Sequence, residues 1–220
     1  MPTSKIYILE SIDTNAGLNG LLVYGEQLLK EINNSISTSI NRNNISCEFI
    51  NIFGKYQWQK TWRKIRKESQ QGIHPMVHII AHGKPKGIEI AGYKELRWRY
   101  ILQQFKKVNN LCGGRLRVTM NVCYAGCCFE DLLTKKELQF EFMLASPDKL
   151  PMNVFNTTKI PNHPFVIFYK TLIEKVSLDK ALKQFRKCLP SKKEKDHCTW
   201  SLIEADDTML YKFSITQIKE

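Results

Sequence analysis

The sequence lacks several features that would place it in a familiar class at once. No apolar stretch approaches the roughly 18 residues of a membrane-spanning helix, and Glu10 and Asp13 interrupt the short apolar run near the start, so no signal peptide is indicated. The patterns GxSxG, GxxxxGK[ST], GxGxxG and HExxH are absent, as is the Cys-x5-Arg of cysteine phosphatases, because residue 129 is Phe129. We therefore expect a cytoplasmic protein with no membrane segment and no cofactor.

A disulfide framework is also missing. The seven cysteines are odd in number, and their spacing along the chain forms no regular pattern. Reduced thiols in a cytosolic enzyme explain this usage better. No internal repeat and no low-complexity segment interrupts the chain, so its 220 residues, 43% of them hydrophobic, indicate a single domain over residues 1–220.

The net charge of +12 requires an explanation in terms of a partner or of solvation. Nucleic acid is one candidate partner, because nucleic-acid-binding proteins carry an excess of Lys and Arg. The basic residues are spread along the chain and not confined to one block, however, which favours a Lys-rich solvated surface. Binding of nucleic acid is therefore possible but not favoured by the sequence.

Apolar periodicity indicates strands that alternate with helices, which is typical of an α/β fold with a mostly parallel sheet. We expect a three-layer sandwich with helices on both faces of the sheet. The predicted strands cover residues 5–10, 45–53, 74–81, 116–122 and 138–145, with a small hairpin over 83–92 around a short strand at 88–90 and a second hairpin made of 199–205 and 209–215. The predicted helices cover residues 18–32, 56–70, 95–108, 127–136, 165–176 and 178–189, and long loops are expected at 33–44 and 146–164.

Two of the predicted strands end in residues that could perform chemistry. One strand ends at His82-Gly83, and the other ends at Cys123, followed by the turn Tyr124-Ala125-Gly126. The carboxyl ends of parallel strands meet at one rim of a sheet, so neighbouring strands would bring His82 and Cys123 within about 5 Å along the backbone. A helix amino terminus just after the cysteine would favour the reactive thiolate. Taken singly, a buried apolar cysteine and a turn histidine remain the simpler explanations.

Histidines recur every four residues at His74, His78 and His82, a spacing that on a helix would form a face of metal ligands. On a strand, the first and last of these would lie about 26 Å apart, too far to share an ion. Cys123, Cys127 and a further cysteine at 128 could act as ligands, but the paired CxxC spacing of a structural zinc site is missing. We therefore predict no metal, and we expect His78 to be a hydrogen-bonded core histidine.

The blocks VHIIAHGKPKGIEIAG and RLRVTMNVCYAG, separated by a helix, resemble the caspase-like cysteine peptidases of clan CD, and within it the CHAT-domain branch. The resemblance covers residues 73–128. It implies a cysteine endopeptidase that cleaves a specific protein substrate, in a bacterial defence or regulatory system, with activation by a protein partner or by processing of a loop, for which the loop at 146–164 is the candidate. It also implies that Cys123 is the nucleophile, that His82 is its acid–base partner, and that the backbone N–H groups of Gly83 and Cys123 form the oxyanion hole.

The resemblance leaves substrate preference open. Relatives that cut after Arg or Lys have Asp two residues before the cysteine, where this chain has Asn121, so we expect a preference that is not strictly basic. Asp148, just after a predicted strand, is a second candidate for substrate binding, although an ordinary loop carboxylate is the simpler explanation.

The alternative function is a catalytically silent caspase-like module that binds a protein or nucleic acid. In that case residues 56–67, where aromatic and basic residues interleave, would form the binding surface. We favour the simpler interpretation, in which Trp58 and Trp62 pack on the sheet and the basic side chains face outward.

Overall fold

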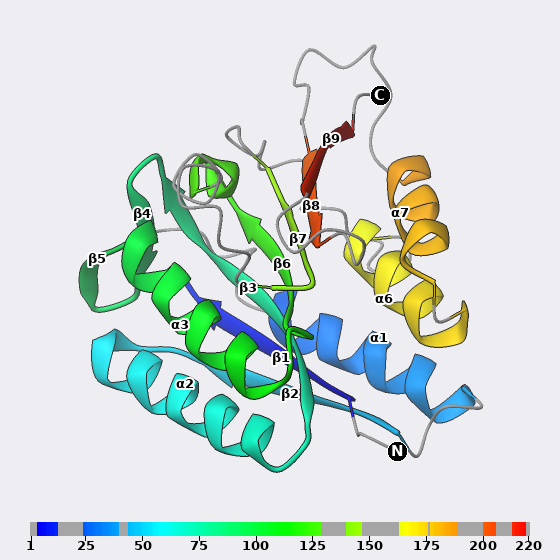
Figure 1. Cartoon of the computed structure of the whole chain (residues 1–220), viewed down its shortest axis with the longest axis horizontal. Helices are drawn as coiled ribbons and strands as arrows, with labels where there is room; N and C mark the ends of the chain where they lie inside the picture. Colours follow the sequence, from blue (N-terminus) through cyan, green and yellow to red (C-terminus); the bar gives the residue numbers. More distant parts are fainter. Residues whose placement is uncertain are drawn as a thin grey trace.

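The computed structural model describes residues 4–12, 24–39, 44–128, 140–146, 163–175, 177–188, 200–205 and 213–218. Nine described strands form one sheet, whose main path runs in the order β2-β1-β3-β6-β7-β8-β9 (Figure 1). The strands are β1 (Ser4–Ser11), β2 (Ile45–Asn51), β3 (His74–Lys84), β4 (Gly87–Ile90), β5 (Tyr93–Arg97), β6 (Arg117–Val122), β7 (Phe142–Ala145), β8 (Trp200–Ala205) and β9 (Phe213–Ile218).

Most neighbouring strands of the main path are parallel. β1 pairs in parallel with β2 and β3, β3 with β6, and β6 with β7, whereas β8 and β9 add to the sheet as antiparallel strands. The β4–β5 hairpin leaves this path and pairs with the end of β3. The predicted α/β class with a mostly parallel sheet is confirmed.

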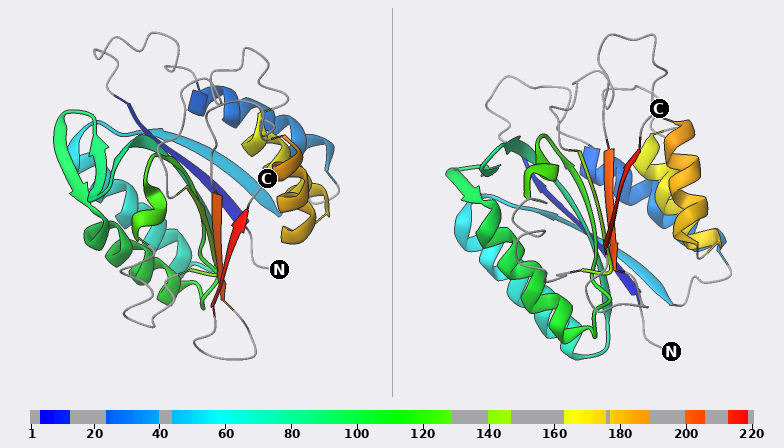
Figure 2. Two further views of the ribbon diagram at one scale, coloured as in Figure 1. Left: turned by 90° about the horizontal axis from the view of Figure 1, so that it is seen from above. Right: turned by 45° about the horizontal axis from the view of Figure 1, so that its top comes forward.

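Helices cover both faces of this sheet (Figure 2). On one face lie α2 (Gly54–Gln70) and α3 (Trp98–Leu111), side by side, and on the other lie α1 (Tyr24–Thr38), α6 (Pro164–Lys175) and α7 (Leu178–Lys187). A short 3-10 helix, η1 (Ala125–Cys127), follows β6. The chain is thus a three-layer sandwich with one apolar core on each side of the sheet.

The core beneath α2 and α3 explains why helix α2 has its sequence pattern. Trp58 and Trp62 are fully buried there, and the Trp62 ring lies 5.5 Å from that of Phe105 on α3. The interpretation of residues 56–67 as an amphipathic helix is therefore confirmed, and its tryptophans are not available to stack on a ligand.

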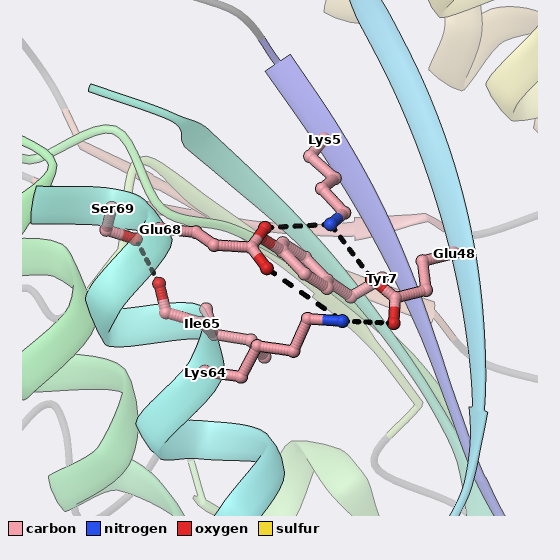
Figure 3. A network of polar contacts seen from close by, with 7 residues as sticks. All are labelled: Lys5, Tyr7, Glu48, Lys64, Ile65, Glu68 and Ser69. Carbon is pink, nitrogen blue, oxygen red and sulfur yellow. Dashed lines mark hydrogen bonds and ion pairs between the residues drawn. The ribbon is translucent and has the colours of Figure 1, made fainter. Parts of the chain in front are cut away.

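Polar contacts fix α2 against β1 and β2 (Figure 3). They involve Lys5 and Tyr7 near the start of β1, which is the opposite end of the strands from His82. The Lys5 ammonium lies 2.7 Å from Glu68 and 2.8 Å from Glu48, and the Tyr7 hydroxyl donates a hydrogen bond to Glu68. Lys64 also pairs with both carboxylates. The two lysines thus hold the carboxylates of β2 and α2 together across the edge of the sheet.

Several predicted boundaries were wrong, among them the end of β3, which continues to Lys84 and not 81. Helix α1 continues to Thr38, because Ile36 is buried and the Ser35 hydroxyl returns a hydrogen bond to the backbone one turn earlier. Residues 93–97 form β5, so α3 begins at Trp98 and not at 95, because Leu96 is buried by the hairpin. Strand β7 begins at Phe142, not at 138.

Several expectations fall outside the described residues. These are the start of the first predicted helix, most of the helix expected at 127–136, nearly all of the loop expected at 146–164, and the turn of the carboxyl-terminal hairpin. Within the described part of the chain, no helix combines the length and the apolar character needed to cross a membrane.

Candidate functional site

Strands β3 and β6 lie next to each other and end at the same rim. Their parallel pairing aligns Ile80 with Asn121 and Ala81 with Val122, which are the last paired residues. His82 is the next residue of β3 and Cys123 is the first residue after β6, so both directly follow a pair whose backbones lie a strand spacing of about 4.8 Å apart. In Figure 1 both strands run toward the hairpin and η1 at upper left.

The backbone beyond the last pair is packed even more closely. A Cβ atom placed on Gly83 would lie 1.8 Å from the carbonyl oxygen of Cys123 and 2.7 Å from the Val122 side chain. Such an approach is open only to glycine. The structure therefore brings His82-Gly83 against Cys123, although 41 residues separate the two segments in the sequence.

Strand alternation assigns His82 and Cys123 to one face of the sheet. Ala81 and Val122 point into the core beneath α2 and α3, so the following residues belong to the opposite face. Cys123 packs there against the apolar cluster beneath α1, α6 and α7. Both side chains are half-buried, as is that of Asn121, which lies two residues earlier on the same face as Cys123.

The turn after Cys123 has a strained backbone. Tyr124 has φ 57° and ψ 18°, the left-handed conformation that side chains other than glycine rarely adopt. The Cys127 N–H donates to the Tyr124 carbonyl, and the Gly126 N–H donates to the Ser146 carbonyl at 2.7 Å. The turn is thereby tied to the end of β7, and strain of this kind is often retained where a side chain must be held in position.

A cavity of about 630 Å³ opens beside His82. It lies between the end of β1 and the β4–β5 hairpin, and its lining includes Ser11, Glu89, Ala91 and Tyr93. Sequence reasoning missed these residues. Ser11 could have been predicted, because β1 is parallel to β3 and so ends at the same rim. Glu89 and Tyr93 could not, because only the pairing of the β4–β5 hairpin with β3 places them there.

Glu10 is a buried carboxyl close to this rim. Its side chain is only 5% exposed and accepts a hydrogen bond from the Gly25 N–H at the start of α1, while Oε1 has no hydrogen-bond partner among the described residues. Burial raises the pKa of Glu10 to about 7, with the Gly25 hydrogen bond acting in the opposite direction. Glu10 was not singled out in the sequence.

The histidine at position 78 is a core residue, as predicted. It is fully buried, and its Nδ1 lies 2.7 Å from the Thr119 hydroxyl, which in turn contacts the Tyr169 hydroxyl. Burial, together with the nearby His163, lowers the pKa of His78 to about 3, so its ring is neutral. Among the described residues, no group of three His, Cys, Asp or Glu side chains is arranged to hold a metal ion.

The remaining candidates lie elsewhere or outside the described residues. Cys128 is buried, and its thiol donates to the Ala125 carbonyl at 2.9 Å, whereas Cys127 is half-buried; neither forms a disulfide. Asp148 falls outside the residues that the structure describes. A second cavity, apolar and of about 310 Å³, lies at the opposite end of the strands, where Ile6 and Met76 line it beneath α6.

No family model and no curated protein matches the sequence. Solved structures do match. A secreted C11 cysteine protease from Bacteroides thetaiotaomicron, in complex with an irreversible peptide inhibitor, has a TM-score of 0.57 and 10% sequence identity, over 91% of this chain and 66% of that one. A second structure of a secreted C11 cysteine protease from that organism, called iotapain, has the same TM-score and identity over 93% and 67%.

The chain thus spans about two thirds of the length of these proteases. The shared feature is the mostly parallel central sheet flanked by helices. The protein therefore has the caspase-like α/β fold of the C11 cysteine proteases.

Proposed function

We propose that the protein is a cysteine endopeptidase that cleaves a protein substrate through a dyad of Cys123 and His82. The observation that carries the proposal is the close packing of Gly83 on the Cys123 backbone, at the ends of two paired parallel strands. The fold shared with cysteine proteases supports it, and the cavity that His82 lines lies at the same rim.

In the proposed reaction, His82 takes the proton of the Cys123 thiol, and the thiolate attacks the carbonyl carbon of the scissile peptide bond to form a carbon–sulfur bond as the carbonyl π bond opens to an oxyanion. The N–H groups of Gly83 and Cys123 stabilise the resulting oxyanion. His82 then protonates the leaving amine as the carbon–nitrogen bond breaks, which leaves a thioester on Cys123. Water, deprotonated by His82, hydrolyses the thioester and regenerates the thiol.

The proposal extends to substrate preference. Asn121 replaces the carboxylate that would select a basic residue before the cut, so a preference that is not strictly basic is expected, and Asp148 is retained as a substrate-binding candidate. Assignment to the CHAT-domain branch, a cytoplasmic role in bacterial defence or regulation, and activation by a protein partner belong to this proposal. The branch, the role and the activation rest on the sequence blocks around His82 and Cys123, and the cytoplasmic location rests on the cysteine usage.

A peptide probe with an electrophilic ketone at its carboxyl end tests the proposal. We expect the probe to label Cys123 in preference to the other cysteines, as read by mass spectrometry of the intact protein and its digest. Cys123→Ala should abolish both labelling and cleavage of a peptide library, and His82→Ala should abolish cleavage while both variants remain folded.

The matched control is Cys127→Ala, which removes a half-buried thiol four residues away. This variant should keep labelling and cleavage at the level of the unmodified protein. Labelling that persists in Cys123→Ala, or a folded protein in which no cysteine is labelled selectively, would favour the silent binding module instead.

A further inference from the structure

The fold collects positive charge on one of its two helical layers. Helices α2 and α3 carry nine basic residues and one acidic residue, whereas α1, α6 and α7 carry seven basic and four acidic residues. The sequence showed this charge as spread, because the two helices are separated by three strands along the chain. Packing side by side on one face unites their charges (Figure 1).

A groove of about 210 Å³ runs between these helices. Each helix contributes one face to this groove. The lining positions are 59, 63 and 66 on α2 and 100, 103, 104 and 107 on α3. Residues three or four apart lie on the same side of a helix, so each set forms one wall. The lining residues are Gln59, Arg63, Arg66, Tyr100, Gln103, Gln104 and Lys107. The groove therefore presents three cations and several amide groups, and no carboxylate lines it.

The cations of the groove are not neutralised within the described part of the chain. No carboxylate there lies within ion-pair distance of Arg63, Arg66 or Lys107. The one acidic residue of α2, Glu68, is already engaged by Lys5, Tyr7 and Lys64 at the sheet edge (Figure 3). Arg66 is held in place by a 2.8 Å hydrogen bond to the buried Gln104.

The polar groups of the groove suit phosphate. A guanidinium presents planar pairs of donors that match phosphate oxygens, and an ammonium adds a point charge. Exposed charges also continue outside the groove, at Lys60 and Lys67 on α2 and at Arg99 on α3. The basic positions at 60, 63 and 67 of α2 are three and four residues apart, a rise of about 4.5 to 6 Å, and those at 99 and 107 of α3 are about 12 Å apart, which favours a ligand with repeated charges.

A folded protein partner fits this surface less well. Protein interfaces depend on buried aromatic and apolar anchors. The aromatic residue of the groove, Tyr100, is half-buried and accepts a hydrogen bond from Gln59, and the tryptophans of α2 lie in the core. We propose that the groove between α2 and α3 binds the phosphodiester backbone of a nucleic acid, without reading its bases.

The test uses the full chain and fluorescein-labelled oligonucleotides of mixed sequence, with single-stranded and duplex DNA and RNA as separate arms. Fluorescence anisotropy should show affinity in at least one arm that falls steeply between about 50 and 200 mM salt. The double variant Arg63→Gln/Lys107→Gln removes two contacts. It should weaken binding at least about tenfold and reduce the slope of log affinity against log salt by about 1.5 to 2.

The matched control is Lys183→Gln/Arg186→Gln, which removes the same two charges from exposed positions on α7. It should leave affinity and slope within about twofold of the unmodified protein. The proposal is overturned if no arm binds, if both pairs weaken binding equally, or if poly-glutamate competes as well as the oligonucleotide. Since Arg63 and Lys107 belong to the helices on the face of the sheet opposite Cys123, Arg63→Gln/Lys107→Gln should leave peptide cleavage unchanged, so this test is independent of the proposed peptidase.

Discussion

Gly83→Ala tests whether the close approach of two strand ends positions the candidate site. The new Cβ would lie 1.8 Å from the Cys123 carbonyl oxygen, whereas real Cβ contacts stay beyond 3.0 Å, so the strand ends must separate by at least about 1.2 Å. The obstacle is backbone, which cannot rotate away as a side chain could. We expect this overpacking to lower the free energy of unfolding by about 1 to 3 kcal/mol and Tm by several degrees.

The effect on activity should be larger than the effect on stability. A displacement of about 1 Å between reacting groups can lower a rate by about 100-fold. The measurements are Tm by calorimetry and kcat/KM on a cleaved peptide, at a temperature where the variant is fully folded. If Gly83→Ala kept both values, the packing of Gly83 on Cys123 would not exist as described.

Gly87→Ala is the matched control. Its Cβ would lie 2.1 Å from the Leu96 carbonyl oxygen, a comparable clash with backbone, but between β4 and β5 of the hairpin and not between β3 and β6. We expect a similar loss of Tm with a much smaller loss of kcat/KM. Equal losses of activity in the two variants would refute the argument that the β3–β6 spacing positions the dyad.

Three further predictions concern strain and buried titratable groups. Tyr124→Gly should keep the free energy of unfolding within about 1 kcal/mol, because glycine tolerates φ 57°, whereas Tyr124→Val should lose at least about 2 kcal/mol in urea unfolding; equal stabilities would contradict the strained turn. For His78, burial lowers the pKa to about 3, so stability is present above the unfolded pKa of about 6.5 and is lost as pH falls toward 3. His78→Gln should therefore reduce the loss of unfolding free energy between pH 7 and pH 5 by about 2 kcal/mol, and an unchanged pH dependence would show that His78 is not buried as a neutral ring. For Glu10, burial raises the pKa to about 7, so stability is present below the unfolded pKa and is lost as pH rises through 7. Glu10→Gln should gain about 2.5 kcal/mol relative to the unmodified protein between pH 5 and pH 8, and a parallel pH profile would contradict the raised pKa.

Much of the fold could be predicted because apolar spacing reports burial. The alternating or continuous apolar runs of β1, β3 and β6 predicted that these segments are strands and predicted their approximate bounds. The spacing of Trp58, Trp62 and Ile65 predicted which face of α2 is buried. The errors arose where local signals conflicted with packing. The Asn- and Ser-rich end of α1 reads as a loop, but the buried Ile36 keeps it helical, and Leu96 reads as part of a helix although the hairpin buries it.

The candidate site was predicted in part. The order of strands and the rim rule led to His82 and Cys123 as neighbours, because parallel strands end on one side. The cavity beside His82 was not predicted, since it depends on how the β4–β5 hairpin folds back, and no residue pattern reports that angle. The buried carboxyl of Glu10 was not predicted either, because burial of a charged residue is set by the helix that covers it.

The sequence by itself determined the strand and helix types, the apolar faces, and the two segments that end in histidine and cysteine, because each depends on residues near one another in the chain. Only the tertiary structure decided that Gly83 packs on the Cys123 backbone, that the Glu10 carboxyl is buried beneath α1, and that cations of α2 and α3 line one groove. The physical reason is that each of these three properties depends on contacts between residues that are far apart in the sequence. Strand register and helix packing create them, and both are settled by which apolar surfaces are buried together.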